Sequence, residues 1–232
     1  MTKVPARTEP PLDCPLCPRL HDFIAGWRER EPQWFNAPVP TFLPPGGDDD
    51  VRLLIVGLAP GLRGANRTGR PFTGDYAGDL LYDTLRRFGF AHGTYEARPD
   101  DGLQLVGSAI VNAVRCVPPE NKPVGAEITT CRKHFFAPTL KRFPNLMAVV
   151  TLGLIAHQST VRALGGRVAA HPFRHGGRQE LAGLSIFSSY HCSRYNTNTG
   201  RLTEEMFVDV FASVRDFLAK DADGASAQST DR

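Results

Sequence analysis

The chain has 232 residues, of which 41% are hydrophobic and 22% charged, and its formal net charge is +3 at pH 7. This length and composition exclude a globally disordered chain and favour one compact domain. The longest apolar stretch, residues 146–156, is too short to cross a bilayer, and the first thirty residues lack the apolar run of a signal peptide. We therefore expect a cytoplasmic protein without membrane contact, whose five cysteines form no disulfide framework.

The positive charge is concentrated in the middle of the chain. Residues 51–218 carry 20 basic and 13 acidic side chains, and the whole chain has 22 Arg but only 5 Lys. Because arginine forms bidentate contacts with phosphate, this basic body favours a polyanionic partner. An arginine-rich, solvated surface without such a partner explains the charge equally well.

Apolar runs and helical patterns alternate from Val51 onward. Four short apolar runs are typical of buried parallel strands: Val51–Gly57, Ser108–Val114, Leu146–Leu152 and Leu184–Tyr190. Helical patterns cover Gly78–Phe88, Ala126–Phe143 with a kink at Pro138, a segment that ends at Leu164, and Thr203–Lys220. The alternation predicts a three-layer α/β/α sandwich with a central, mainly parallel four-stranded sheet. We expect one domain over residues 14–220, between a flexible leader (1–13) and a disordered tail (221–232).

Polar, loop-like segments follow three of the predicted strands. They are Gly57–Asp75, then Asn112 with Arg115–Pro123, and finally Tyr190–Arg201. Ligands of parallel α/β sheets bind beyond the carboxyl ends of the strands. The three segments therefore predict one binding site at this edge of the sheet.

Individual residues in these segments have both functional and ordinary explanations. The glycines of Gly57–Gly64 match neither dinucleotide nor Walker patterns. Their free N–H groups could cradle a phosphate, or the segment could be a simple Gly-Pro turn. Asp75 is a candidate general base or electrostatic stabiliser, or merely a loop cap. His191 lies in a loop too polar for packing, which makes it a candidate site residue.

The cysteines form a second pattern. Cys14 and Cys17 are a C-x2-C pair, and Cys116 and Cys131 follow far downstream. Four thiolates suit a structural Zn²⁺ or a [4Fe–4S] cluster, and the spacing leaves both open beside a chance arrangement. Cys192 follows His191 directly, so the two point to opposite faces of an extended segment and Cys192 is expected to pack in the core.

Taken together, these residues resemble the iron–sulfur uracil-DNA glycosylases, and within them the type-b group, family five of that superfamily. The resemblance runs from about Cys14 to Phe217. Its carriers are CPLC (14–17), GLAPG (57–61), GANRTGRPFTGD (64–75), VNAVRCVPPENKP (111–123), Cys131 and YHCSRYNTNTGRLT (190–203). It implies that the four cysteines hold a [4Fe–4S] cluster with an architectural role.

The resemblance also implies roles for site residues. Type-a relatives carry a catalytic acid where this chain has Leu58, and in the type-b group the loop aspartate, here Asp75, takes over. The implied catalytic residues are Asp75, Asn121 and His191, and the implied base pocket comprises Gly57, Leu58, Ala59, Phe72, Asn112 and His191. Phe72 would stack on the base and Asn112 would read its polar edge. The expected DNA contacts are Gly61, Arg67, Arg194, Tyr195 and Arg201.

The implied function is that of a monofunctional DNA glycosylase. It would hydrolyse the N-glycosidic bond of flipped-out uracil, and of other deaminated or damaged bases, and so initiate base excision repair. We expect a nucleoid-associated monomer that leaves the DNA strand intact, because no lysine accompanies the motifs. Two alternatives stay open: a non-enzymatic iron–sulfur or zinc protein that binds DNA or senses damage, and a glycosylase-like fold that holds damaged DNA without turnover.

Overall fold

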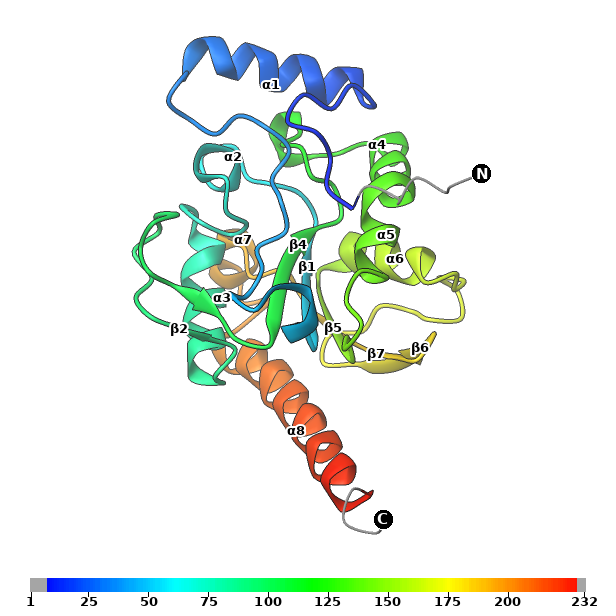
Figure 1. Cartoon of the computed structure of the whole chain (residues 1–232). Helices are drawn as coiled ribbons and strands as arrows, with labels where there is room; N and C mark the ends of the chain where they lie inside the picture. The colour runs from blue at the N-terminus through cyan, green and yellow to red at the C-terminus, as the bar shows by residue number, and fades with distance from the viewer. Residues whose placement is uncertain (1–7, 229–232) are drawn as a thin grey trace.

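The computed structural model describes residues 8–228 and has a five-stranded sheet at its centre (Figure 1). The strand order is β4-β1-β5-β7-β6. The first four strands are parallel, and β6 is antiparallel to β7. Their bounds are β1 Leu53–Gly57, β4 Ser108–Asn112, β5 Ala148–Leu152, β6 Arg178–Leu181 and β7 Leu184–Ser189. The mainly parallel sheet is thus confirmed.

The prediction of four strands is one strand short. Strand β6 has the sequence RQEL, and its residues alternate between exposed and half-buried. An edge strand of this kind needs no continuous apolar run, because only one face and one edge are covered. Its pattern therefore gave no strand signal in the sequence.

Helices cover both faces of the sheet, as predicted (Figure 1). Side chains alternate along β1: Leu53 and Ile55 pack in one core, and Leu54 and Val56 in the other. On the first face lie α3 (Tyr76–Arg87) and α8 (Glu204–Gln228). On the second face lie α5 (Ala137–Leu140) and α6 (Leu154–Ala163), and α4 (Gly125–Cys131) packs in a third, smaller cluster with Leu20 and Phe135.

The helical segment around Pro138 is interrupted, as its sequence predicts. A single π turn, Arg132–Phe136, joins α4 to α5 and precedes the proline. Proline has no N–H to donate to the carbonyl four residues earlier, and a wider turn relieves the clash of its ring with that carbonyl.

Several elements escaped the sequence analysis. The largest is α1 (Pro18–Arg30), in which only Leu20 and Ile24 are buried. A helix with so little apolar surface has a weak periodic signal. The others are short: 3-10 turns Gly47–Asp50 and Pro119–Asn121, helices α2 Ala65–Thr68 and α7 Arg194–Asn198, and the two-stranded ribbon of β2 Ala91–His92 with β3 Gln104–Leu105.

The predicted termini fall only partly within the described residues. Residues 1–7 and 229–232 of the predicted leader and tail lie outside them, and α8 continues into the predicted tail as far as Gln228. Of the leader, Glu9 contacts the domain: its carboxylate accepts from the hydroxyl of Thr41 at 2.5 Å and lies 3.2 Å from Arg115 and from Arg142.

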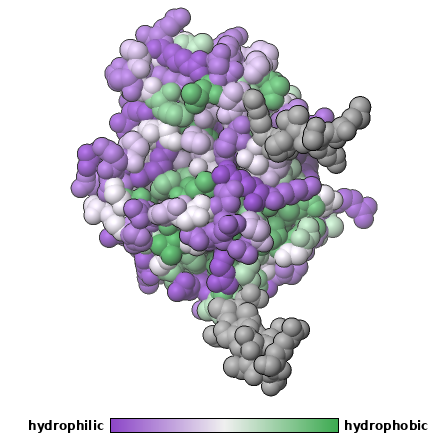
Figure 2. Space-filling view, viewed as in Figure 1, coloured by the Kyte–Doolittle hydropathy of each residue, from purple (hydrophilic) through white to green (hydrophobic). Residues whose placement is uncertain are grey.

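Hydrophilic residues dominate the surface in the view of Figure 2, including the α1 end, and hydrophobic patches are interspersed among them. Within residues 8–228, no helix combines the length and the apolar character needed to span a membrane.

Candidate active site

The loops that follow β1, β4 and β7 enclose one cavity of about 660 Å³. The predicted site residues that line it are Leu58, Ala59, Gly61, Phe72, Asp75, Asn112, Asn121, His191 and Arg194. The convergence of the three polar segments on one site is therefore confirmed. The roles assigned to the individual residues stay predictions.

Gly57, which was predicted to belong to the base pocket, does not itself line this cavity but packs directly behind two residues that do. It ends β1 beside Asn112, the last residue of β4. A β-carbon at this position would collide with the amide oxygen of Asn112 and would lie 2.6 Å from the tip of the Phe72 ring. Only glycine leaves room for both side chains, which explains why β1 ends on this residue.

Phe72 forms one wall and has a strained backbone. Its φ is +52°, in the left-handed region that bulky residues rarely adopt. Such a conformation costs about 1–3 kcal/mol and persists only where surrounding contacts enforce it. The ring is buried and stacks against the His191 imidazole, with centroids 5.9 Å apart. The strain therefore serves to turn an aromatic face into the cavity.

Asp75 lies at the N-terminus of α3, in the cap position, but its side chain makes no capping hydrogen bond. The carboxylate packs against the glycine loop, where a β-carbon on Gly61 would lie 3.0 Å from Oδ2. Burial raises the pKa of Asp75, and the nearby N–H groups of Gly78 and Ala77 lower it in part, although neither forms a capping hydrogen bond with the carboxylate. The loop glycines thus give a carboxylate access to the cavity in a desolvated setting.

His191 follows β7 and is held by its backbone, because the side-chain amide of Asn196 donates to its carbonyl at 2.8 Å. Burial lowers the pKa of His191 to about 4. The imidazole is therefore neutral at pH 7, where it can act as a hydrogen-bond donor without carrying charge.

Three residues that line this cavity each carry a buried polar atom without a hydrogen-bond partner among the described residues. They are Asp75 Oδ1, Asn112 Oδ1 and His191 Nδ1. A buried polar atom without a partner costs about 1–3 kcal/mol, so native proteins seldom leave one unpaired. Three of them around one cavity indicate a polar ligand that supplies the missing partners.

The predicted DNA contacts are more dispersed. Arg194 lies at the rim, 5.3 Å from the centre of the Tyr76 ring, and Tyr195 is 73% exposed. Arg67 lines a neighbouring depression beside Trp27 and Trp34, while Arg201 stacks on Tyr190. Arg67, Tyr195 and Arg201 are therefore outside the cavity wall, where a longer DNA strand, and not the base, would meet them.

The sequence analysis did not single out Tyr76 and Ser193, which also line the cavity. Both are direct neighbours of predicted residues along the chain, and Tyr76 is 38% exposed. An exposed tyrosine beside a candidate carboxylate is the signal that could have identified the first of them.

The four predicted metal ligands, Cys14, Cys17, Cys116 and Cys131, line a second, smaller pocket. Burial raises the pKa of the Cys17, Cys116 and Cys131 thiols, that of Cys131 to about 11. The backbone N–H of Arg115 donates to Cys131 Sγ at 3.4 Å. Across the described part of the chain, no group of three or more His, Cys, Asp or Glu side chains is arranged so that it could hold a metal ion.

These four soft sulfur donors fit an iron–sulfur cluster chemically, because such clusters take thiolates and accept N–H···S bonds from the backbone. The fifth cysteine, Cys192, is fully buried in the core, which confirms its predicted packing role.

Comparison with known proteins identifies the fold family. A family model described as "Uracil DNA glycosylase superfamily" matches residues 44–215. The chain belongs to this superfamily. A type-5 uracil-DNA glycosylase of Thermus thermophilus is 43% identical over 87% of this chain and 92% of its own length. A type-5 enzyme of Pyrobaculum aerophilum is 37% identical over 86% of both chains.

A more distant relative is a type-4 uracil-DNA glycosylase of Thermotoga maritima, 26% identical over 75% of this chain and 82% of its own length. The higher identity to the type-5 relatives confirms the resemblance to family five that the sequence motifs indicate. Within the uracil DNA glycosylase superfamily, the chain is a member of the type-5 group.

Proposed function

We propose that this protein hydrolyses the N-glycosidic bond of uracil in DNA and so begins base excision repair. The observation that carries the proposal is that Asp75, Asn112 and His191, each with a buried unpartnered atom, line one cavity together with Phe72. Uracil is planar and polar: its ring N–H suits the Asn112 oxygen and its carbonyls suit donors. The names of the type-5 relatives support the same substrate.

The base must leave the helix to reach this cavity. Extrusion of a nucleotide costs a few kcal/mol, least for mismatched bases such as uracil opposite guanine. Stacking of the base on Phe72 would offset about 1–3 kcal/mol of this extrusion cost. Deaminated bases that resemble uracil at their polar edge would enter the same cavity, which makes further damaged bases candidate substrates.

The charges that develop in bond cleavage match the two titratable groups. As the bond between C1′ and the base nitrogen breaks, the bonding electrons go to the base and positive charge spreads over the sugar. His191 is neutral and donates a hydrogen bond to the base oxygen, where it stabilises the anion. The Asp75 carboxylate stabilises the cationic sugar and orients a water molecule, aided by Asn121 at the cavity edge.

Water then bonds to C1′, and its proton passes by way of Asp75 to solvent while the released base is protonated. The products are an abasic site and free uracil. No lysine is among the described residues that line the cavity, so we propose hydrolysis without strand cleavage.

DNA phosphates on either side of the base would be bound by backbone N–H groups near Gly61 and by arginines. Arg194 lies at the rim, and Arg67 and Arg201 lie farther out. Contacts of this kind position the DNA without reading its sequence, which suits an enzyme that finds one altered base anywhere.

The four cysteines of the second pocket would hold a [4Fe–4S] cluster. They come from the segment before α1, from the loop after β4 and from the end of α4. When bound, the cluster supplies an architectural link between these segments. The chemistry of uracil release uses no residue of this pocket.

The test is release of uracil from duplex DNA that contains a single G·U pair, measured with enzyme in excess. We expect free base and alkali-labile abasic DNA, with no nick before alkali treatment. Binding of the duplex without release would contradict the enzymatic proposal and would indicate a protein that only holds damaged DNA.

A further inference from the structure

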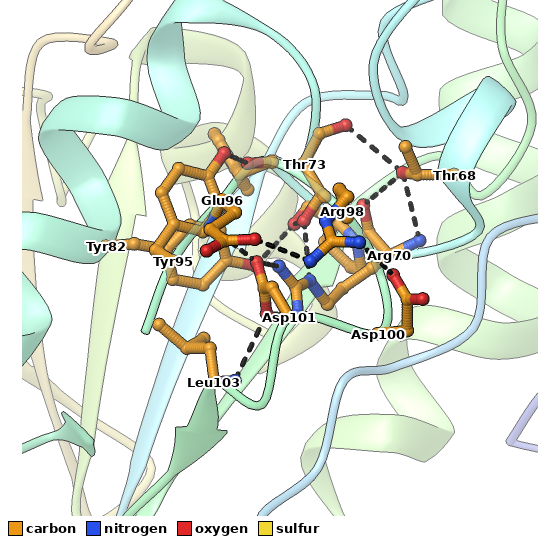
Figure 3. Close-up of polar contacts among 12 residues, drawn as sticks. Thr68, Arg70, Thr73, Tyr82, Tyr95, Glu96, Arg98, Asp100, Asp101 and Leu103 are labelled. Carbon is orange, nitrogen blue, oxygen red and sulfur yellow. Dashed lines mark hydrogen bonds and ion pairs between the residues drawn. The ribbon is translucent and has the colours of Figure 1, made fainter. Parts of the chain in front are cut away.

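A buried arginine, Arg70, belongs to the loop that carries Phe72 and Asp75, and Figure 3 shows it beside Asp101. The Arg70 side chain is 6% exposed and that of Asp101 is fully buried. Two parallel bonds join them, at 2.8 Å and 2.7 Å. Asp101 also accepts from the N–H groups of Glu96 and Leu103. The carboxylate therefore fixes the guanidinium in one orientation.

Three aromatic rings surround the same guanidinium. Its central carbon lies 5.4 Å from the ring centres of Phe42 and Tyr82 and 5.8 Å from that of Tyr95. These rings belong to the segment before β1, to α3 and to the connection between β2 and β3. A cation enclosed in this way is attracted to each ring face, and lysine could not reproduce the planar fork.

The polar contacts of this cluster end on the loop that bears the site residues. Arg70 Nε donates to the Thr73 hydroxyl at 2.7 Å. The Tyr82 hydroxyl donates to the carbonyl of Pro71 at 2.6 Å, and that of Tyr95 donates to the carbonyl of Phe72 at 3.2 Å. The peptide groups on both sides of the strained φ of Phe72 are thus held by hydrogen bonds.

The carbonyl of Phe72 also packs closely against the backbone of α3. Gly78, in the first turn of α3, lies so close that a β-carbon there would collide with the carbonyl oxygen of Phe72. The same loop continues through Gly74, at φ +88°, to Asp75 only three residues beyond Phe72. Any relaxation at Phe72 is therefore transmitted to the carboxylate.

We propose that Arg70, Asp101, Tyr82 and Tyr95 form a clamp that holds Phe72 in its strained conformation and thereby sets the position of Asp75. This inference rests on the proposed glycosylase function. The four are positioning residues, because none of them lines the cavity. The clamp places an aromatic face and a carboxylate before substrate arrives, so that no binding energy is spent on ordering the loop.

The decisive variant is Tyr95→Phe, which removes one hydroxyl and keeps the ring. We expect single-turnover uracil release to slow by about tenfold or more, because small misplacements near reacting atoms cost rate steeply. Affinity for the G·U duplex should stay within about twofold, since the DNA contacts are elsewhere. Arg70→Lys keeps the charge but loses the planar guanidinium that makes two bonds to Asp101, so its uracil release should be slower still. The matched control is Arg98→Ala, an exposed arginine of the same segment paired with Glu96.

A combination with Asp75→Ala separates positioning from general loss of structure. If Tyr95 acts through Asp75, then Tyr95→Phe should slow the Asp75→Ala enzyme by much less than it slows the wild type. Equal slowing in both backgrounds would overturn the clamp. So would wild-type rates in both Tyr95→Phe and Arg70→Lys.

Crystal structures of the two clamp variants provide a readout that does not depend on activity. We expect Phe72 to leave positive φ in at least Arg70→Lys, and an unchanged loop in both would overturn the proposal. A wild-type protein that releases no uracil would contradict the proposed function. The conformation of Phe72 in the variant structures would still show whether the clamp holds this loop.

Discussion

The two pockets of this molecule hold their polar groups in different ways. The active-site cavity is built on the ends of three strands, and three residues that line it carry buried polar atoms without a partner among the described residues. The cysteine pocket brings together segments far apart in the sequence, which share a small apolar cluster to which α1 contributes Leu20. The fold itself forms the first pocket, whereas we propose that a bound cluster links the segments of the second. Changes in the first should alter rate, and changes in the second should alter stability.

The largest expected effect on rate is that of Asp75→Ala. Loss of the carboxylate should slow single-turnover uracil release by about 10²–10⁴-fold, the usual range for a general base or charge stabiliser. Binding of the G·U duplex should change little. Asp83→Ala, which removes an exposed carboxylate from the same helix, is the control. An Asp75→Ala enzyme with unchanged rate would remove Asp75 from the mechanism.

The largest expected effect on stability is that of Cys131→Ser. If the four cysteines hold a cluster, this variant should lose iron and be destabilised by roughly 3 kcal/mol or more, because metal binding is coupled to folding. Iron content and the visible absorbance of the purified protein report the first change, and thermal melting reports the second. Cys192→Ser, in the core and outside the cysteine pocket, should keep its iron. Full iron content in Cys131→Ser would contradict the ligand assignment.

The pH dependence of the rate shows whether His191 acts as a neutral or as a charged imidazole. Since burial lowers its pKa to about 4, the imidazole is already neutral through the ordinary histidine range near 6.5. Because the pKa of Asp75 is raised above its usual 3.8, its carboxylate becomes protonated at a higher pH than an ordinary aspartate does. His191 should therefore contribute no step near pH 6.5, and protonation of Asp75 should lower the rate as the pH falls. A step near pH 6.5 that His191→Gln abolishes would show that a charged imidazole takes part.

The smallest expected effect is a gain in stability from Asp75→Asn. A carboxyl whose pKa is raised on folding binds protons more tightly in the native state, so its ionisation destabilises the protein above pH 3.8. At pH 7 the variant should melt higher by about 2–4 °C, and the difference should vanish in acid. Calorimetry at two pH values checks this. A lower melting temperature at pH 7 would show that the carboxylate stabilises the loop.

The sequence predicted what regular patterns encode. Continuous apolar runs located the four parallel strands, and the polar segments after them located Phe72, Asp75, Asn112 and His191 around one cavity. Strand β6 and helix α1 escaped because they bury too little apolar surface to produce a period. Hydrophobic periodicity therefore failed to predict these two elements at the edges of the fold.

The clamp could not be predicted for a different reason. Arg70 and Asp101 are 31 residues apart, and no spacing rule links an arginine in one loop to a carboxylate in another. The positive φ of Phe72 was equally hidden, because local sequence favours negative φ for phenylalanine and tertiary contacts override it. The motifs predict DNA contacts for Arg67, Tyr195 and Arg201. Their positions outside the cavity depend on the paths of the loops, which motifs do not encode.

The bond network of Glu9 has a practical consequence for expression. This carboxylate neutralises two guanidinium groups, of which Arg115 is completely enclosed and sits next to a cysteine in the chain. A truncated version that starts at Cys14 would keep every motif named above. It would leave the buried Arg115 guanidinium without its counter-charge, which typically costs several kcal/mol of folding free energy. Trimming to this boundary would thus destabilise the domain, and an affinity tag belongs upstream of Glu9 or at the opposite terminus.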